Sequence, residues 1–238
     1  MDIKSIAKVT GAATVLLLSG CSGAFSTLDP AGPAAGSVLP LTLAMIIVAL
    51  AVFVGLIVLC VFAVRRNSKD ISDAEVQRLQ NRWIIAGGIA LPTVAITTLL
   101  AFGIPIGHSL LPLPFQEGEV MRVDVKARQW FWRVSYPERK IELTDEIHIP
   151  VNTPVDFHIT SEDVIHSFWA PRLGGKIDAI PGRTNVVRLE ADEVGEYRGL
   201  CTEYCGQGHT AMQFKVIAHS AEDFEEWLLQ QEDSDKND

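Results

Sequence analysis

The sequence predicts an α+β membrane protein in which a two-helix transmembrane hairpin precedes an all-β domain. Two uncharged, strongly apolar stretches cover about residues 40–64 and 83–106, and each is long enough to cross a hydrocarbon core about 30 Å thick. After residue 115, short segments alternate apolar and polar residues between Gly, Pro and Asn turns. Many short strands at close spacing indicate a β-sandwich or a small barrel.

The first 20 residues are typical of a lipoprotein signal peptide. A weakly basic start precedes an apolar run that is too short to span a bilayer. Leu18-Ser19-Gly20-Cys21 then has the pattern of a bacterial lipobox, which predicts Cys21 as a lipidated first residue of the mature chain. The alternative is an uncleaved tail with a chance cysteine. Residues 21–37 are rich in Gly, Ala, Ser and Pro, so we expect a flexible periplasmic spacer.

The hairpin as a whole is predicted to occupy residues 38–107, with residues 65–82 as its connecting loop. This loop contains five Arg and Lys residues, whereas the segment from residue 21 to 39 contains none. The positive-inside rule therefore places the loop in the cytoplasm. The remainder of the chain then lies on the periplasmic side of a bacterial inner membrane, which the protein crosses as a multi-pass subunit.

The β domain is expected over residues 115–230. Its strand-like segments include 121–134, 146–150, 154–160, 185–189, 195–200 and 212–219. Phe224, Trp227 and Leu228 have helical spacing, so residues 221–230 predict a short amphipathic helix. Residues 231–238 are polar and are expected to be a disordered tail.

The chemistry of the chain is concentrated in one segment, Cys201 to Met212, with the pattern C-x-E-x-C-x3-H-x2-M. Thiolate, imidazole and thioether are soft to borderline donors, which favour copper over calcium or magnesium. A further imidazole, His166, lies upstream in an apolar run that predicts a strand end or a buried loop. The donor set therefore indicates a copper site.

The second cysteine distinguishes this set from a single blue copper site, which needs one Cys, two His and usually a Met. Two thiolates can bridge two metal ions, with one imidazole on each. We infer a dinuclear copper centre with these ligands: bridging Cys201 and Cys205, terminal His166 and His209, axial Met212, and the main-chain oxygen of Glu203.

Two other readings stay open from the residues alone. Exported thiols oxidise, so Cys201 and Cys205 could form a structural disulfide. Two Cys and two His also satisfy tetrahedral zinc. Neither alternative gives Met212 a role.

The same residues resemble subunit II of haem–copper cytochrome c oxidases, with its dinuclear copper A centre. The resemblance covers most of the chain after about residue 38. It rests on residues 161–167 (SEDVIHS), 176–183 (KIDAIPGR), the ligand segment 201–212 and residues 129–132 (QWFW). It implies a cupredoxin-like Greek-key sandwich whose ligand loop joins the last two strands, with His166 presented from an earlier loop.

The resemblance also implies partners and further site residues. Trp130 would be the exposed ring through which the electron enters from cytochrome c. The Glu203 side chain would help to hold magnesium at the boundary with subunit I, which carries the haem. Subunit III and membrane lipid are further expected partners. The family commonly has an acidic residue just before the second span, but this chain has Gln80-Asn81-Arg82, which argues against a proton-channel role.

Charge supports a basic protein partner. Residues 115–238 contain 24 Asp and Glu against 13 Lys and Arg, a net of 11 negative charges. Such a surface attracts a basic protein and disfavours nucleic acid. Glu162 and Asp163, just before His166, are candidates for the rim on which cytochrome c docks.

The predicted function is one-electron relay from cytochrome c to a haem of subunit I, where oxygen is reduced to water and protons are pumped. The chain has no C-x2-C-H haem-attachment motif, so it supplies electrons to the oxidase without a haem of its own. A quinol oxidase subunit II would share the fold without the copper ligands. The nearest alternatives are the electron-accepting subunit of a nitric oxide reductase type of enzyme and a copper-binding lipoprotein.

Overall fold

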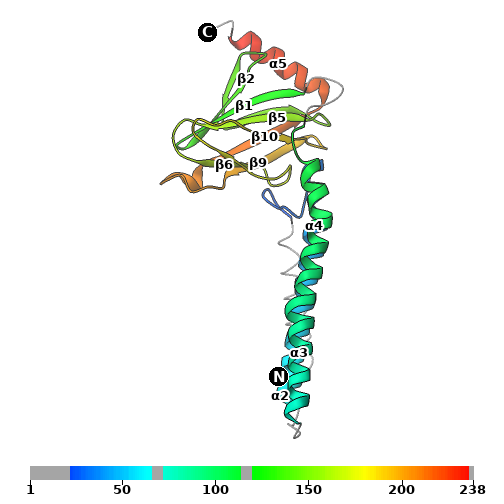
Figure 1. Ribbon diagram of the computed structural model, residues 1–238. Coiled ribbons are helices and arrows are strands. Elements are labelled where there is room, and N and C mark those ends of the chain that lie inside the picture. The colour runs from blue at the N-terminus through cyan, green and yellow to red at the C-terminus, as the bar shows by residue number, and fades with distance from the viewer. Residues whose placement is uncertain (1–21, 66–71, 114–119, 236–238) are drawn as a thin grey trace, which may run out of the picture. The chain divides into compact units, whose positions relative to one another are not determined.

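The computed structural model describes residues 22–65, 72–113 and 120–235 (Figure 1). The predicted signal peptide and Cys21 lie outside these residues. The described chain divides into two units. One unit is the segment Pro40–Ser109, and the other joins the residues up to Leu39 with those from Leu110 onward.

The first unit consists of two long apolar helices. Helix α2 runs from Pro33 to Arg65, and Asp73–Ser109 is a second continuous helical stretch. Both are long and apolar enough to cross a membrane. They approach each other where Leu41 lies 3.8 Å from the position of a β-carbon on Gly103. Their apolar side chains are exposed in the isolated chain, as expected for surfaces that face lipid or a partner subunit.

The second helical stretch differs from the predicted span of 83–106. It consists of α3 (Asp73–Trp83), the π-helical turn η1 (Ile84–Ala90) and α4 (Leu91–Ser109). Ser72 begins α3 by accepting a hydrogen bond from the Glu75 amide, so part of the expected loop 65–82 is helical. Pro92 follows the π-helical turn closely. Because proline has no amide proton and crowds the carbonyl four residues earlier, a local widening of the helix relieves that strain.

The second unit is a β-sandwich, which confirms the predicted fold. In the described residues one five-stranded sheet has the order β3-β2-β1-β5-β8 and the other β4-β10-β9-β6-β7. The strands of the first are β1 (Met121–Arg128), β2 (Phe131–Tyr136), β3 (Ile141–Thr144), β5 (Val155–Ser161) and β8 (Asn185–Leu189). Those of the second are β4 (Glu146–Pro150), β6 (His166–Trp169), β7 (Ile177–Ala179), β9 (Gly195–Cys201) and β10 (Gln213–His219).

Alternation along the strands builds the core between the sheets. In β5 every second residue is buried, beginning with Val155 and Phe157. The opposite sheet contributes Phe168 and Phe214, whose rings stack 4.2 Å apart. Trp132 completes this aromatic group and lies 5.5 Å from each of them. The predicted strand 121–134 is in fact two strands, because the chain turns between Arg128 and Phe131.

The flexible spacer expected at 21–37 is not found in its described part. Residues 29–35 dock on the β domain as a strap, and α2 already begins at Pro33. The Ala31 amide donates to the Arg172 carbonyl and its carbonyl accepts from the Asp192 amide, at 2.7 and 2.9 Å. Gly32 makes this contact possible, since a β-carbon there would lie 2.1 Å from the Glu190 carbonyl oxygen. Small residues in this segment permit close packing, which composition alone does not distinguish from flexibility.

The C-terminal helix is longer than predicted. Helix α5 extends from Ala221 to Asp235, so residues 231–235 are helical where a disordered tail was expected. Glu232 pairs with Arg139 at 3.3 Å. The predicted apolar residues Phe224, Trp227 and Leu228 are buried against the sandwich.

Candidate metal centre

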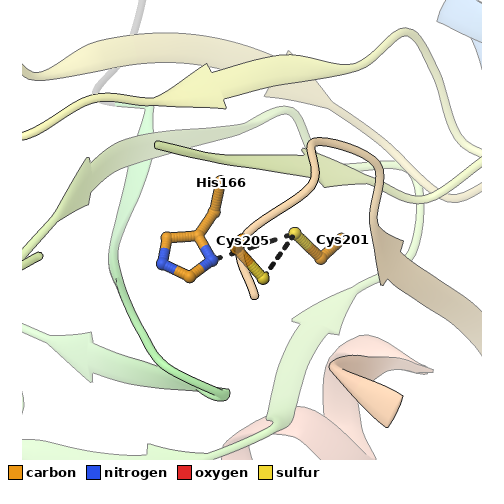
Figure 2. Close-up of side chains that lie close together, drawn as sticks. All are labelled: His166, Cys201 and Cys205. Atoms are coloured by element: carbon orange, nitrogen blue, oxygen red, sulfur yellow. Dashed lines mark hydrogen bonds between the residues drawn. The ribbon is translucent and has the colours of Figure 1, made fainter. Parts of the chain in front are cut away.

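The predicted metal ligands converge at one end of the sandwich. The sulfur atoms of Cys201 and Cys205 are 3.9 Å apart, and the Nδ1 atom of His166 lies 3.8 Å from the Cys201 sulfur (Figure 2). The Nδ1 atom of His209 lies 3.7 Å from the Cys205 sulfur, and the Met212 sulfur lies 3.9 Å from the same atom. The two thiols therefore occupy the centre of the group, with one imidazole beside each.

Three parts of the fold bring these residues together. Cys201 is the last residue of β9, and the ligand loop 202–212, which includes η2 (His209–Ala211), leads into β10. His166 is the first residue of β6, which pairs with β9. The loop is closed by a hydrogen bond of 2.9 Å from the Cys201 amide to the Met212 carbonyl. The prediction that the ligand loop joins the last two strands is thus correct. His166 begins a strand, which agrees with the strand end expected from its apolar run and differs from the earlier loop that the resemblance implied.

Asp163 supports His166 from its outer side. Its carboxylate lies 2.9 Å from the Nε2 atom of His166. It also accepts hydrogen bonds from the Val164 and Gln129 amides at 2.7 and 2.8 Å. Partial burial works against ionisation, but these amide bonds and the contact with His166 lower the pKa of Asp163 to about 2. The carboxylate therefore leaves Nδ1 of His166 as the nitrogen that faces the sulfur atoms.

This arrangement fits a soft metal ion. Metal-binding histidines almost always donate their outer N–H to a carboxylate, a carbonyl or water, as His166 can to Asp163. The sulfur separation of 3.9 Å excludes a disulfide in this structure and is less than twice a metal–thiolate bond of about 2.3 Å. Burial, together with the neighbouring Cys201, raises the pKa of Cys205 to about 12. A bound cation favours loss of the thiol protons because it neutralises the negative charge of the thiolates.

Glu203 contributes through its backbone. Its carbonyl oxygen lies 3.2 Å from the Cys201 sulfur, beside the group of thiols and imidazoles. Its side chain is exposed to solvent. The carbonyl and the carboxylate can therefore serve two different contacts.

Trp130 lies directly on the ligand loop. Its indole Nε1–H donates to the Cys205 carbonyl at 3.3 Å, and the Gln129 side-chain amide donates to the same oxygen at 2.7 Å. The ring packs so closely on Gly208 that a β-carbon there would lie 2.4 Å from Trp130 Cγ and Cδ2. Yet 40% of Trp130 remains exposed. The Trp130 side chain therefore contacts both solvent and the backbone of Cys205.

Glu162 and Asp163, the candidates for the docking rim, also make contacts within the domain. The Glu162 carboxylate lies 3.0 Å from Arg133, 3.7 Å from Lys126 and 3.8 Å from Arg128. Asp163 is engaged with His166 and the backbone. Both acidic groups are therefore neutralised or hydrogen-bonded within the domain.

Sequence reasoning missed three supporting residues. Asp163 was recognised only as a charge, although a carboxylate three residues before a ligand histidine is itself a signal of support. Gln129 carried no such signal, because its contact with Cys205 spans 76 residues. Gly208 is explained only by the position of Trp130. His148 and His219 contact each other at 2.7 Å on another part of the domain.

The fold and the donor set define a β-sandwich protein with two candidate membrane-spanning helices and a cluster of soft donor atoms that is consistent with a copper site. The family described as cytochrome c oxidase subunit II, periplasmic domain, matches residues 137–219. Cytochrome c oxidase subunit 2 of Alkalihalophilus pseudofirmus is 32% identical over 225 residues, which cover 90% of this chain and 64% of that protein. The cytochrome bo(3) ubiquinol oxidase subunit 2 of Pseudomonas putida is 35% identical over 229 residues, covering 93% of this chain and 71% of the relative.

A further relative and one solved structure are also similar to this chain. Ubiquinol oxidase subunit 2 of Acetobacter aceti is 33% identical, with 94% of this chain and 74% of the relative covered. The periplasmic domain of cytochrome oxidase subunit II of Bradyrhizobium japonicum superimposes with a TM-score of 0.48 and 29% identity, over 50% of this chain and 99% of that chain. The chain belongs to the subunit II family of haem–copper terminal oxidases.

Proposed function

We propose that this chain is the electron-accepting subunit of an aerobic terminal oxidase, with a dinuclear copper A centre at the end of its sandwich where β9, β6 and the ligand loop meet. The observation that carries the proposal is the convergence of both thiols, both imidazoles and the Met212 thioether at the end of β9. A structural disulfide or a zinc site would leave the Met212 sulfur, which is buried and aimed at Cys205, without a purpose.

Each ligand would have a separate part in holding copper. Cys201 and Cys205 would bridge, His166 and His209 would bind at the two ends, and the remaining positions would fall to Met212 and the Glu203 carbonyl. When bound, a copper pair supplies a one-electron redox centre. The protein keeps the surroundings rigid through the loop-closing hydrogen bond and the Asp163 contact.

Trp130 would be the residue through which the electron enters. The route from solvent is short, because the exposed indole donates a hydrogen bond to the carbonyl of a bridging cysteine. Gln129 shares that carbonyl and is held by Asp163 through its amide, so the indole and His166 are fixed by one network. A donor protein that docks on Trp130 would therefore contact a side chain that is hydrogen-bonded to the ligand loop.

Charge and family membership support our proposal for the donor and the acceptor. The acidic domain favours a basic donor, for which cytochrome c is our proposal. The electron would pass to a haem of subunit I, where oxygen is reduced to water and protons are pumped. The exposed Glu203 carboxylate would hold magnesium at the boundary with subunit I, and subunit III and lipid would contact the helices. Residues 115–235 would then lie on the periplasmic side of the inner membrane.

A second candidate donor is quinol, since two relatives named as ubiquinol oxidase subunits are 33% and 35% identical to this chain. The complete set of soft donors argues for copper and against that reading. An electron-accepting subunit of a nitric oxide reductase type of enzyme would have the same site. Only the reaction that its partner subunit catalyses would distinguish it from an oxidase subunit.

The first test is the copper content and the paramagnetic resonance spectrum of the full chain in detergent. We expect two coppers per chain that share one unpaired electron. Cys205→Ser should lose this spectrum. Cys60→Ser should retain it, because Cys60 is an exposed cysteine on α2, outside the site. One copper, zinc, or a persistent Cys201–Cys205 disulfide under reducing conditions would overturn the proposal.

The second test concerns the donor. In the assembled oxidase, oxygen consumption should be supported by reduced cytochrome c and abolished by Cys205→Ser. Turnover with a quinol alone, unaffected by that substitution, would identify the chain as a quinol oxidase subunit. Nitric oxide consumption without oxygen consumption would identify the alternative partner enzyme.

A further inference from the structure

A histidine pair lies beneath α5, on strands that do not contribute to the metal centre. His148 of β4 is 6% exposed, and its ring stacks on Trp227 of α5 at 4.1 Å with an interplanar angle of 7°. His219, the last residue of β10, lies in the same plane as His148 and 6.3 Å from Phe224 of α5. The apolar residues of α5 thus rest on two imidazole rings.

The two rings belong to a directed chain of hydrogen bonds. Nδ1 of His148 and Nε2 of His219 are 2.7 Å apart, and Nε2 of His148 lies 2.7 Å from the Glu146 carboxylate. Since the carboxylate accepts, His148 donates with Nε2 and, when neutral, accepts with Nδ1. His219 must then donate with Nε2. The geometry therefore fixes the tautomers of both neutral rings.

The nitrogen–nitrogen contact can hold only one proton. A first added proton leaves the pair with one charge and the contact intact, because the shared proton can move to either ring. A second added proton would place two N–H groups, both on cations, head to head at 2.7 Å. That state requires the rings to separate, and the His148 ring cannot move while Trp227 lies stacked on it.

We propose that His148 and His219 form an acid-sensitive latch, which holds α5 on β4 and β10 at neutral pH and releases it when both rings are protonated. The latch does not depend on the function proposed for the metal centre. Its release would expose Phe224, Trp227 and Leu228, which are buried in the docked state.

The charged groups around the histidine pair influence the pH at which α5 is released. Glu146 on β4 and Lys215 on β10, which pair with each other, flank His148, and Asp223 on α5 acts on His219. Tyr136 of β2 approaches through its hydroxyl, which accepts from the His148 amide and donates to its carbonyl. Burial lowers the pKa of His148 despite the opposing influence of Glu146, and burial also lowers the pKa of His219.

The sign of the effect follows from these shifts. Both rings take up protons less readily when α5 is docked than when they are solvated, so the docked state binds fewer protons. Docking is therefore strongest above the ordinary histidine pKa of 6.5 and weakens as the pH falls below it. For each proton taken up on release, the equilibrium constant for opening should rise about tenfold per pH unit.

The test is hydrogen–deuterium exchange of the full chain in detergent between about pH 7.5 and about pH 5, corrected for the intrinsic pH dependence of exchange. Amides of residues 221–235 should exchange about 10-fold faster for each pH unit below about 6.5 where release takes up one proton, and up to about 100-fold faster where it takes up both, while β1 and β5 keep their protection. His219→Gln retains a donor toward His148 and removes one titrating ring, so this variant should reduce the pH dependence. His158→Gln, on β5 and outside the pair, is the matched control and should behave like the wild type.

Two outcomes would overturn the latch. In the first, α5 exchanges at the same corrected rate at both pH values, or loses protection only together with β1 and β5. In the second, His219→Gln retains the full pH dependence of the wild type. If His219→Gln lowers overall stability, the ratio of α5 exchange to β1 exchange at each pH still separates release from unfolding.

Discussion

Gly208→Ala should interrupt the contact between Trp130 and the ligand loop while leaving every metal ligand in place. The new β-carbon would lie 2.4 Å from Trp130 Cγ and Cδ2 and 2.9 Å from its Cβ. The indole must therefore move by at least 1.0 Å to reach the 3.4 Å of ordinary contact. Its hydrogen bond to the Cys205 carbonyl, already 3.3 Å long, cannot survive such a shift.

Gly208→Ala should affect the rate of electron transfer more than the free energy of unfolding. Loss of the hydrogen bond and the overpacking together should lower the free energy of unfolding by about 1–3 kcal/mol. Misplacement of a positioned group by about 1 Å can slow a reaction about 100-fold. We therefore expect electron uptake from cytochrome c to fall by about 10- to 100-fold.

The measurement is stopped-flow oxidation of reduced cytochrome c by the assembled oxidase, with the copper spectrum recorded in parallel. Gly175→Ala is the matched control, because a β-carbon at that exposed position meets nothing within 4 Å. The reasoning is refuted if Gly208→Ala transfers electrons at the wild-type rate. It is also refuted if the spectrum is lost together with the rate, since the defect would then lie in metal binding.

Three further substitutions test other parts of the structure. Asp163→Asn cannot accept all of the amide and imidazole hydrogen bonds of the carboxylate, so copper affinity should fall about 10- to 100-fold in a chelator competition. Gly32→Ala should lower the free energy of unfolding by about 1–3 kcal/mol, because the strap is forced off a carbonyl oxygen; Gly36→Ala, in open space, should not destabilise, and equal denaturation curves for both would contradict the docked strap. Tyr136→Phe removes both hydrogen bonds to the His148 backbone and should cost about 1–3 kcal/mol in chemical denaturation, whereas an unchanged midpoint would show that water replaces the hydroxyl.

Local patterns were sufficient to predict much of the architecture. Period-two alternation located the central strands, since residues such as Val123 and Val125 face a core that accepts only apolar side chains. Donor chemistry was equally local, because Cys201 to Met212 supplies most of the metal ligands within 12 residues. The structure brings all of the expected ligands together.

The features that were missed depend on contacts distant in sequence. The strap looked like a linker because glycine is equally common in flexible linkers and at closely packed positions. Only the contact of Gly32 with the Glu190 carbonyl, which is distant in sequence, shows that this glycine is closely packed. Helix α5 continues past its last apolar residue, where Glu232 pairs with Arg139 across 93 residues. Asp163 looked like a docking charge because no local rule connects it to Gln129, 34 residues earlier.

The burial of the two thiols has a consequence for assembly. Cys201 and Cys205 are each 4% exposed, and the Trp130 ring lies over the loop that carries one of them. A metal donor protein cannot touch sulfur atoms in this closed state. Loading of the proposed copper ions would therefore take place while the loop is open, either before β10 has paired with β9 or during a brief local opening. The lifetime of that open state, and not the affinity of the finished site, sets the time available to deliver each ion.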